Sequence, residues 1–213
     1  MTRDSGRFIT FEGPDGSGKT GQLDLLAEEL IQAGYPILTT REPGGTCIGD
    51  QIRATLLDLK NTDMVDRTEA LLYQAARAQL VDEVIKPQLA SGGVVLCDRY
   101  ADSTLAYQGY GHQNTLESLR GIIHYATGGL IPDLTILMDL APEVGLQRRV
   151  DAGGVNRLDA YDIEFHRRVR DGYLEMAHDQ PERWVIVNAD RPFETVQAEI
   201  RSILLDRLGS WGY

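Results

Sequence analysis

The fold of this chain is decided by residues 13–20, Gly13-Pro14-Asp15-Gly16-Ser17-Gly18-Lys19-Thr20. They match the pattern G-x-x-x-x-G-K-[ST] at every fixed position. A short apolar run, residues 8–11, precedes them and predicts a buried strand. Apolar residues then recur at helical spacing from Leu23 to Ile31, and Gly34 ends that pattern. Strand, glycine-rich loop and helix in this order predict a phosphate-binding loop.

Each part of this loop has a chemical task. The glycines let successive backbone N–H groups converge on anionic oxygens, and the start of the helix adds a partial positive charge. Lys19 can reach the β- and γ-phosphates of a nucleotide, and the hydroxyl of Thr20 can bind Mg²⁺. We therefore predict that residues 13–20 bind a nucleoside triphosphate such as ATP.

Four more apolar runs, residues 36–40, 94–97, 134–138 and 184–187, alternate with segments of helical periodicity. This alternation predicts an α/β fold, with a five-stranded parallel sheet and helices on both faces. We expect a long helix from about residue 67 toward 85, limited or kinked by Pro87, and a loop around residues 107–109. The 213 residues contain no repeat or linker, which predicts one domain over residues 1–213.

The composition narrows the possible partners and the compartment. A formal net charge of −11 makes long nucleic acid and anionic membranes poor partners. The two cysteines, Cys47 and Cys97, imply no disulfide framework and favour a reducing cytoplasm. No apolar run approaches the 18 residues that a membrane span needs, so we expect a soluble protein.

Charged side chains follow the predicted strands at the edge where ligands gather on parallel sheets. The loops that begin at Gly13, Arg41, Asp98 and Asp139 are therefore expected to line one crevice. Asp98 can hold Mg²⁺ or its waters, although it can also be an ordinary strand-end residue. Arg99 and Arg41 indicate a second anion, so the acceptor itself carries phosphate. Such an acceptor is already ionised near neutral pH and needs no strong general base.

Tyr73 and Arg77 are four residues apart on the predicted long helix and share a face. The ring can stack on a nucleobase while the guanidinium binds the edge of that base. Taken alone, the pair fits better with Tyr73 in the core and Arg77 paired with an acid.

A polar, glycine-containing segment after the fourth strand, about residues 148–161, suits a lid over phosphates. Arg157 lies outside the apolar pattern and is the expected mobile cation, while Arg148 and Arg149 fit a lid or a solvated helix end equally well. The phosphate-binding loop has Gly16 at its centre, so the charge that develops during transfer must be met by a cation from elsewhere.

Together these motifs resemble the thymidylate kinase family, and the similarity runs from Phe11 to about Pro192. The stretches that carry it are residues 11–20, 40–46, 75–77, 98–100, Ser103, 106–109, 132–135 and 157–159. The resemblance implies a P-loop NTPase fold, transfer of the ATP γ-phosphoryl group to dTMP with Mg²⁺, and a homodimer. Two residues depart from the family pattern, namely Gly21 after the Lys-Thr pair and Asp159 in the lid.

The resemblance also implies roles for single residues. It implies that Asp15 approaches the sugar of the acceptor, that Arg99 binds its phosphate and that Tyr73 stacks on thymine. It also implies Arg77 at the base edge, Tyr107 against a ribose 2′-hydroxyl, and Gln108 and Arg53 elsewhere in the pocket. Arg41 is added to these acceptor contacts because of its place at a strand end. Lys19, Asp98, Arg99 and Arg157 are the expected catalytic residues, and Thr20 and Asp98 the expected metal ligands. Gly16 together with Arg157 resembles the bacterial type, in which the lid supplies the catalytic arginine.

Two other readings remain open at this stage. One is a kinase for another nucleoside monophosphate or a deoxynucleoside. The other is a GTP-dependent switch or a silent nucleotide-binding module. The chain has no N-K-x-D guanine signature and no D-x-x-G after the third strand, which argues against a GTPase.

Overall fold

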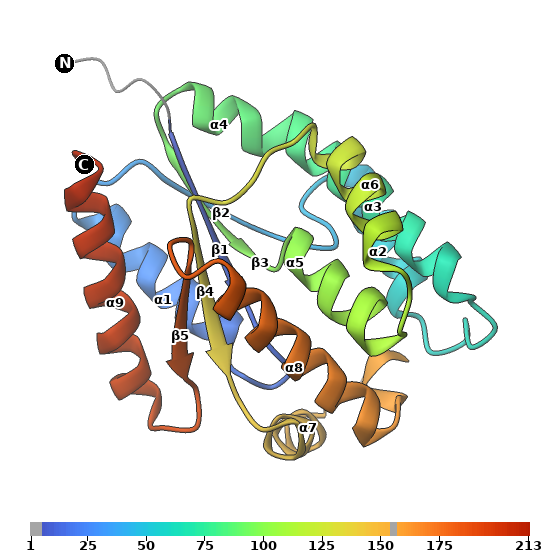
Figure 1. Cartoon of the computed structure of the whole chain (residues 1–213). Helices are drawn as coiled ribbons and strands as arrows, with labels where there is room; N and C mark the ends of the chain where they lie inside the picture. The colour runs from blue at the N-terminus through green and yellow to red at the C-terminus, as the bar shows by residue number, and fades with distance from the viewer. Residues whose placement is uncertain (1–5, 154–156) are drawn as a thin grey trace.

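The computed structural model describes residues 6–153 and 157–213, and it confirms the predicted α/β class. Its centre is a sheet in the order β2-β3-β1-β4-β5, with every pair of neighbours parallel (Figure 1). The strands are β1 Arg7–Glu12, β2 Ile37–Arg41, β3 Val94–Asp98, β4 Leu134–Asp139 and β5 Trp184–Asn188. Each predicted strand is present within one or two residues of its expected ends.

Period-two alternation on the strands explains why both faces of the sheet are covered. Ile9, Leu96 and Ile136 point to one face and pack against the helices α1 and α9. Phe8 and Val95 point to the other face and pack against the helical segment around Leu80 and Ile85. Helix α8 covers the same second face beside β4 and β5. Helices on both faces agree with the sequence prediction.

The helical elements, in chain order, have the following bounds. They are α1 Lys19–Gln32, α2 Cys47–Leu57, α3 Asp66–Leu80, η1 Val81–Ile85, α4 Lys86–Ala90, α5 Ala101–Thr104, η2 Leu105–Gly111, α6 Leu116–Thr127, α7 Pro142–Asp151, η3 Arg157–Ala160, α8 Ile163–Asp179 and α9 Phe193–Ser210. No helix within the described ranges is long and apolar enough to cross a membrane.

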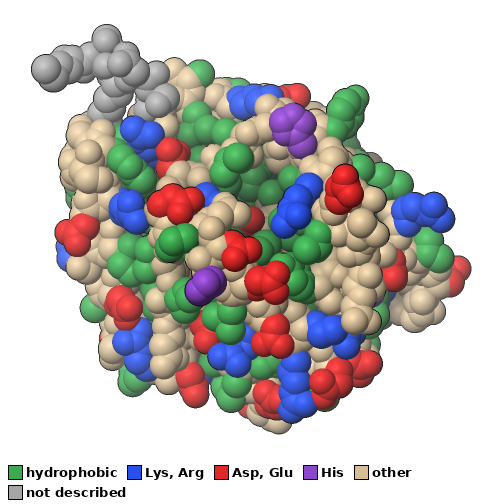
Figure 2. Space-filling model, in the orientation of Figure 1, with side chains coloured by type: hydrophobic (Ala, Val, Ile, Leu, Met, Phe, Trp, Pro, Cys, Tyr) green, Lys and Arg blue, Asp and Glu red, His purple; other side chains and the backbone are tan. Residues whose placement is uncertain are grey.

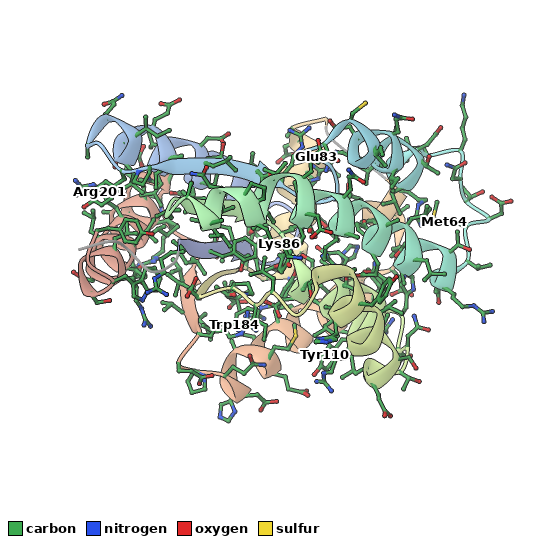
Figure 3. The ribbon with its side chains drawn as sticks, turned by 90° about the horizontal axis from the view of Figure 1, so that it is seen from above. Met64, Glu83, Lys86, Tyr110, Trp184 and Arg201 are labelled. Carbon is green, nitrogen blue, oxygen red and sulfur yellow. The ribbon has the colours of Figure 1, made fainter. Side chains whose placement is uncertain are left out.

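The sequence predicted that Pro87 limits or kinks the long helix, and the helical path continues through Pro87, with a π-helical segment before it. Residues 66–90 run on as α3, η1 and α4, with Lys86 labelled along this path in Figure 3. The five-residue segment η1 is a π-helix, and Pro87 lies at the start of α4. Proline is tolerated in the first turn of a helix, and a π turn changes the hydrogen-bonding register before it. The chain therefore stays helical to Ala90.

The expected loop around residues 107–109 is also helical, because α5 and η2 run from residue 101 to 111. The glycines that suggested a loop serve close helix packing instead. A Cβ on Gly111 would lie 2.6 Å from the ring of Phe165 on α8, and one on Gly172 would lie 2.4 Å from the ring of Tyr110. Small residues at these contacts let η2 lie directly on α8, which fixes the positions of Tyr107 and Gln108.

The strand register brings the expected loops together. Asp98 pairs with both Phe11 and Arg41, so β1, β3 and β2 end side by side. The loops that begin at residues 13, 42 and 99 are therefore neighbours, as predicted. On the face shown in Figure 2, acidic and basic side chains are interspersed with hydrophobic ones between them.

Candidate functional site

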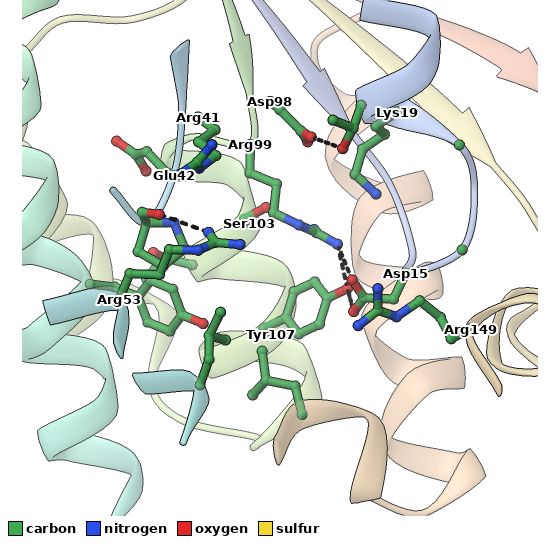
Figure 4. Close-up of a pocket in the computed structure, with 18 of the residues that line it drawn as sticks. Asp15, Lys19, Arg41, Glu42, Arg53, Asp98, Arg99, Ser103, Tyr107 and Arg149 are labelled. Atoms are coloured by element: carbon green, nitrogen blue, oxygen red, sulfur yellow. Dashed lines mark hydrogen bonds and ion pairs between the residues drawn. The ribbon is translucent and has the colours of Figure 1, made fainter. Parts of the chain in front are cut away.

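A cavity of about 480 Å³ lies at the carboxyl ends of these strands (Figure 4). It is lined by Asp15, Gly16, Gly18, Lys19, Thr20, Gly21, Arg41, Glu42, Pro43, Arg53, Leu57, Tyr73, Asp98, Arg99, Ser103, Thr104, Tyr107, Gln108, Arg149 and Leu158. Phosphate-binding groups occupy one side, and the aromatic and amide side chains Tyr73 and Gln108 belong to the same cavity. Twelve of the residues predicted from the sequence are in this lining.

Lys19 is folded back onto the glycine-rich loop. Its Nζ donates to the carbonyl oxygens of Gly13 at 3.0 Å and Pro14 at 2.8 Å, and to Ser17 Oγ at 3.2 Å. Burial and the nearby Arg99 guanidinium lower the pKa of Lys19 to about 8. An anion in the loop would therefore bind next to a lysine whose charge it stabilises.

Close packing explains the glycine at the centre of the loop. Gly16 has φ of +77°, and a Cβ there would lie 2.1 Å from the carbonyl oxygen of Gly145 on α7. A basic side chain at position 16 has no room, so a cation for the transferring phosphate must come from another element. Helix α7, which starts against this loop, carries Arg149 one turn after Gly145.

Thr20 and Asp98 form a pair of oxygen donors beside the loop. Thr20 Oγ1 donates to Asp98 Oδ2 at 2.5 Å, and Asp98 Oδ1 is buried without a hydrogen-bond partner among the described residues. Within those residues no cluster of three or more His, Cys, Asp or Glu side chains is placed to hold a metal. Two oxygen ligands fit Mg²⁺, which is usually held by one or two side chains plus phosphate oxygens and water.

Arg99 is held in a cage of polar side chains. Its Nη2 donates to Asp15 Oδ1 at 2.8 Å and to the hydroxyl of Tyr107 at 3.0 Å, and that hydroxyl donates to Asp15 Oδ2 at 2.7 Å. Burial works to raise the pKa of Asp15, but Arg99 and Lys19 outweigh it and hold this pKa well below its usual range. The Asp15–Arg99–Tyr107 triangle visible in Figure 4 is thus an ionised, pre-formed cluster.

The backbone at Arg99 is held in a conformation that most residues avoid. Its φ is +69°, and its N–H donates to the carbonyl oxygen of Phe11 at 2.9 Å. A non-glycine residue in this region is strained and persists only where its surroundings fix it. The strain aims the guanidinium back over the strand ends.

Glu12 supports this cage from beneath. Its carboxyl accepts hydrogen bonds from the Tyr100 N–H at 2.7 Å, Ser103 Oγ at 2.6 Å and Tyr173 Oη at 2.9 Å. Complete burial, followed by the charge of Asp102, raises the pKa of Glu12 to about 7. The sequence analysis assigned no role to Glu12.

Arg41 and Arg53 lie on the opposite wall of the cavity. Arg53 Nη1 donates to the carbonyl oxygen of Pro43 at 2.8 Å. Arg41 Nη2 lies 3.9 Å from Asp50 Oδ1. Burial and the neighbouring Arg41 guanidinium lower the pKa of Arg53. An anion placed between them would relieve the repulsion of the two like charges.

Arg77 is not among the described residues that line the cavity. It is 1% exposed and pairs with Glu42, with Nη2 to Oε2 at 2.5 Å. Its nitrogens also donate to Gln74, Thr104 and the carbonyl oxygen of Tyr100, which uses all five donors. The alternative in which Arg77 pairs with an acid matches this arrangement, whereas contact between Arg77 and a base stays a prediction.

Arg157 is likewise turned away from the cavity. Its Nε donates to the carbonyl oxygen of Leu56 at 3.0 Å, Nη1 donates to Tyr161 at 3.0 Å, and Nη2 donates to Glu69. Only 8% of Arg157 is exposed. Its role as the mobile cation stays a prediction, and residues 154–156 of the predicted lid lie outside the described residues.

From the sequence, Arg149 fitted a lid or a solvated helix end equally well, and in the structure it reaches the cavity. It lines the cavity beside Asp15, and its Nη2 donates to Asp159 Oδ2 at 3.1 Å (Figure 4). Its Nε is buried and has no hydrogen-bond partner among the described residues. Sequence alone could not separate Arg149 from Arg148, because only the helix phase places Arg149 over the loop.

Other lining residues carried little or no signal in the sequence. Leu57 is an ordinary apolar residue of α2, Leu158 lies in the motif stretch 157–159 but had no role of its own there, and Thr104 follows the motif residue Ser103. They reach the cavity because α2, η3 and α5 are packed around it, which is a tertiary effect that a linear pattern does not show.

Comparisons with known proteins identify the relatives of this chain. A family model described as Thymidylate kinase matches residues 11–200. A thymidylate kinase from Roseiflexus castenholzii is 50% identical, with 95% of this chain and 94% of that protein covered, and one from Deinococcus radiodurans is 50% identical, with 95% and 98% covered. The crystal structure of thymidylate kinase from Ehrlichia chaffeensis matches with a TM-score of 0.78 at 33% identity, covering 94% of this chain and 98% of that one.

Proposed function

The chain belongs to the thymidylate kinase family, and we propose on that basis that it transfers the γ-phosphoryl group of ATP to dTMP, giving dTDP and ADP. One observation supports this function above the others. A single cavity has the phosphate-binding loop in one wall and Arg99, Tyr73 and Gln108 in the others. Donor phosphates and a phosphorylated acceptor can therefore meet inside it, as an in-line transfer requires.

We assign ATP binding to residues 13–20. We assign dTMP binding to the polar cage around Arg99 and to the part of the cavity wall formed by Tyr73 and Gln108, which we call the base-binding wall. Arg99 would bind the dTMP phosphate, Asp15 and Tyr107 would face the sugar, and Tyr73 would stack against thymine. Arg41 and Arg53 would add positive charge on the facing wall. The acceptor phosphate is its own nucleophile, so these residues need only orient it and offset the repulsion between two polyanions.

Mg²⁺ is the proposed cofactor, held by Thr20 and Asp98 together with ATP phosphate oxygens. When bound, it would neutralise charge on the phosphates. The chain's own residues would supply the rest. Lys19 and the loop N–H groups would orient the donor, and Arg149, which lines the cavity beside the loop, would offset the charge that develops on the transferred group.

We propose that residues 1–213 form one kinase domain with a lid at about 148–161, and that two copies form a homodimer in the cytoplasm. Exposed apolar side chains on the adjacent helices α3 and α6, Leu71 and Tyr125, suit a subunit contact. The thiols of Cys47 and Cys97, which form no disulfide with each other, suit a reducing compartment. Light scattering of the purified protein tests the dimer directly, and a monomeric mass would contradict it.

A panel of acceptors tests the proposed reaction. Purified protein is incubated with ATP, Mg²⁺ and one of dTMP, dUMP, dCMP, dGMP or thymidine, and ADP formation is measured. We expect dTMP to give the highest kcat/KM. A higher value for another mononucleotide or for thymidine would support the alternative kinase, and ATP binding without any transfer would support a silent module.

A further inference from the structure

A buried polar cluster lies behind Tyr73 and Gln108, and its central residue, Glu69, has no part in the reaction proposed above. It consists of Glu69 on α3, Gln108 on η2, His112 at the end of η2, and Arg157 on η3. The carboxyl of Glu69 is 1% exposed. Its Oε1 accepts from Gln108 Nε2 at 2.7 Å, and Oε2 accepts from Arg157 Nη2. The carboxylate of Glu69 on α3 therefore accepts hydrogen bonds from both η2 and η3.

The chemistry of Glu69 decides which end of the Gln108 amide faces it. Burial alone would raise the pKa of Glu69, but the His112 ring, whose Nε2 lies 3.4 Å from Glu69 Oε1, and the donors of Arg157 and Gln108 outweigh burial and lower this pKa, so the carboxylate is ionised. An ionised carboxylate only accepts hydrogen bonds, whereas a carboxamide has a donating NH₂ and an accepting oxygen. The NH₂ of Gln108 must therefore face Glu69.

The carbonyl oxygen of Gln108 is then the end left for the cavity. Gln108 lines the cavity, and none of the described residues donates a hydrogen bond to its Oε1. Asn114 Nδ2 fixes the backbone of Gln108 by donating to its main-chain carbonyl at 2.8 Å. The cavity wall near Tyr73 thus presents one hydrogen-bond acceptor of defined orientation.

We propose that Glu69 is a positioning residue for base selection, which locks Gln108 so that its carbonyl oxygen accepts from the N3–H of thymine and rejects cytosine. This inference rests on the proposed function. Thymine carries a donor at N3, while cytosine carries a lone pair there, so the locked carbonyl pairs with one base and repels the other. A buried group that finds no partner costs about 1–3 kcal/mol, which corresponds to roughly 5- to 150-fold in discrimination.

Glu69→Gln tests the lock, because a glutamine at this position can donate as well as accept. Gln108 is then free to turn its NH₂ toward the cavity and donate to N3 of cytosine. We expect the ratio of kcat/KM for dTMP to that for dCMP to fall at least tenfold, mainly through KM. A ratio within twofold of the wild type would overturn the inference.

Asp66→Asn is the matched control. Asp66 lies one turn before Glu69 on the same helix, and its Oδ1 is 3.5 Å from His112 Nδ1, but it makes no hydrogen bond to Gln108 among the described residues. This variant should keep the wild-type ratio. In a Gln108→Leu background, Glu69→Gln should produce no further change in the ratio, whereas a further tenfold change would show that Glu69 acts by another route.

Gln108→Glu gives an answer even if Glu69→Gln fails to fold. The neighbouring Glu69 carboxylate would keep the introduced carboxyl protonated, since two adjacent carboxylates share a proton. Its hydroxyl would donate to Glu69 and its carbonyl would face the base. We expect Gln108→Glu to keep the preference for dTMP that Gln108→Leu loses, and an equal loss in both variants would contradict the proposal.

The outcomes separate this inference from the function on which it rests. A wild-type enzyme that phosphorylates no dTMP would overturn both. A wild-type enzyme active on dTMP, with a base ratio insensitive to Glu69→Gln, would overturn only the role of Glu69.

Discussion

Both the backbone and the side chain of Arg99 are preorganised for binding phosphate. Its backbone is in the left-handed region at φ of +69°, and its side chain is fixed by Asp15, Ser103, Tyr107 and Tyr173. A guanidinium held this way loses little further entropy when it binds phosphate. The motif residues 98–100 pointed to Arg99, but the cage depends on Tyr173, which lies 74 residues further along the chain and had no signal in the sequence.

Lys19 leads to a prediction about protons. Because its pKa is lowered to about 8, the side chain is half charged at pH 8, and bound phosphates will raise this pKa. ATP binding at pH 8 should therefore take up about half a proton, measured calorimetrically in buffers of different ionisation enthalpy. The Glu12→Gln variant should take up the same amount, which would show that the proton binds to Lys19 and not to Glu12. Release of protons on ATP binding would contradict the assignment to Lys19.

Arg149 and Arg157 are expected to have different roles. Arg149→Ala should lower kcat by roughly 100-fold, because it removes a cation that would face the phosphates. It should lower the free energy of unfolding less than Arg157→Ala, because Arg149 is more exposed than Arg157. Arg157→Ala should lower the free energy of unfolding by about 3 kcal/mol, since it leaves the buried Glu69 carboxylate short of a partner. Denaturant unfolding and steady-state rates measure the two effects.

The exposed Arg167, which pairs with Glu143 and Glu164, supplies a control for this pair of variants. Arg167→Ala should change neither quantity appreciably. If Arg157→Ala lost more activity than Arg149→Ala while keeping full stability, Arg157 would be the catalytic cation, as its place in the sequence predicts, and the role proposed for Arg149 would be wrong.

Glu12 predicts a pH dependence of stability. Its pKa is raised in the folded protein to about 7 from 4.5, so between these values the folded chain keeps a proton that the unfolded chain has released. This contribution is fully present below about pH 4.5 and is lost as pH rises through 7. Between pH 5 and pH 8 the free energy of unfolding of the wild type should fall by about 2 to 3 kcal/mol relative to that of Glu12→Gln. Denaturant unfolding at both pH values measures this difference. A pH-independent difference would show that Glu12 does not titrate there.

At the scale of elements, the packing of η2 on α8 controls the acceptor wall. Gly172→Ala on α8 would place a Cβ 2.4 Å from the Tyr110 ring and push η2, with Tyr107 and Gln108, out of position. We expect a loss of about 1–3 kcal/mol in stability and a higher KM for dTMP. Thermal unfolding and initial rates test both effects.

Gly121→Ala on α6 is the control, because no described atom lies within 4 Å of the added Cβ. It should stabilise the protein by about 0.5–1 kcal/mol, since alanine is the better helix former. Equal effects from Gly121→Ala and Gly172→Ala would show that helix propensity matters here and close packing does not.

The elements also show why some of the fold was predictable. Strands β1 to β5 were found because continuous apolar runs mark buried parallel strands. The expectation of a loop around residues 107–109 was wrong, because these residues lie in the helical segment η2, where Gly111 allows close approach to Phe165 on α8. The course through Pro87 depended on a π turn that has no signature in the sequence.

At the scale of the whole molecule, the parallel topology makes the site. It joins residues 13–20, 41–53 and 98–108 at one edge, and the strand ends were enough to predict that these segments meet. The partners of Arg77 and Arg157 were not predictable, because both pair with glutamates, Glu42 and Glu69, from distant segments. Periodicity shows which face of a helix is apolar, but not which buried charges meet.

The central claim is that this one cavity brings the phosphates of ATP and dTMP together, with thymine against Tyr73 and the dTMP phosphate on Arg99. A crystal structure of the protein with ADP, Mg²⁺ and dTMP tests it most directly. We predict ADP phosphates in the loop of residues 13–20, the dTMP phosphate within hydrogen-bond distance of Arg99, and the thymine ring parallel to that of Tyr73. Density for dTMP outside this cavity, or with its base away from Tyr73 and Gln108, would contradict the account.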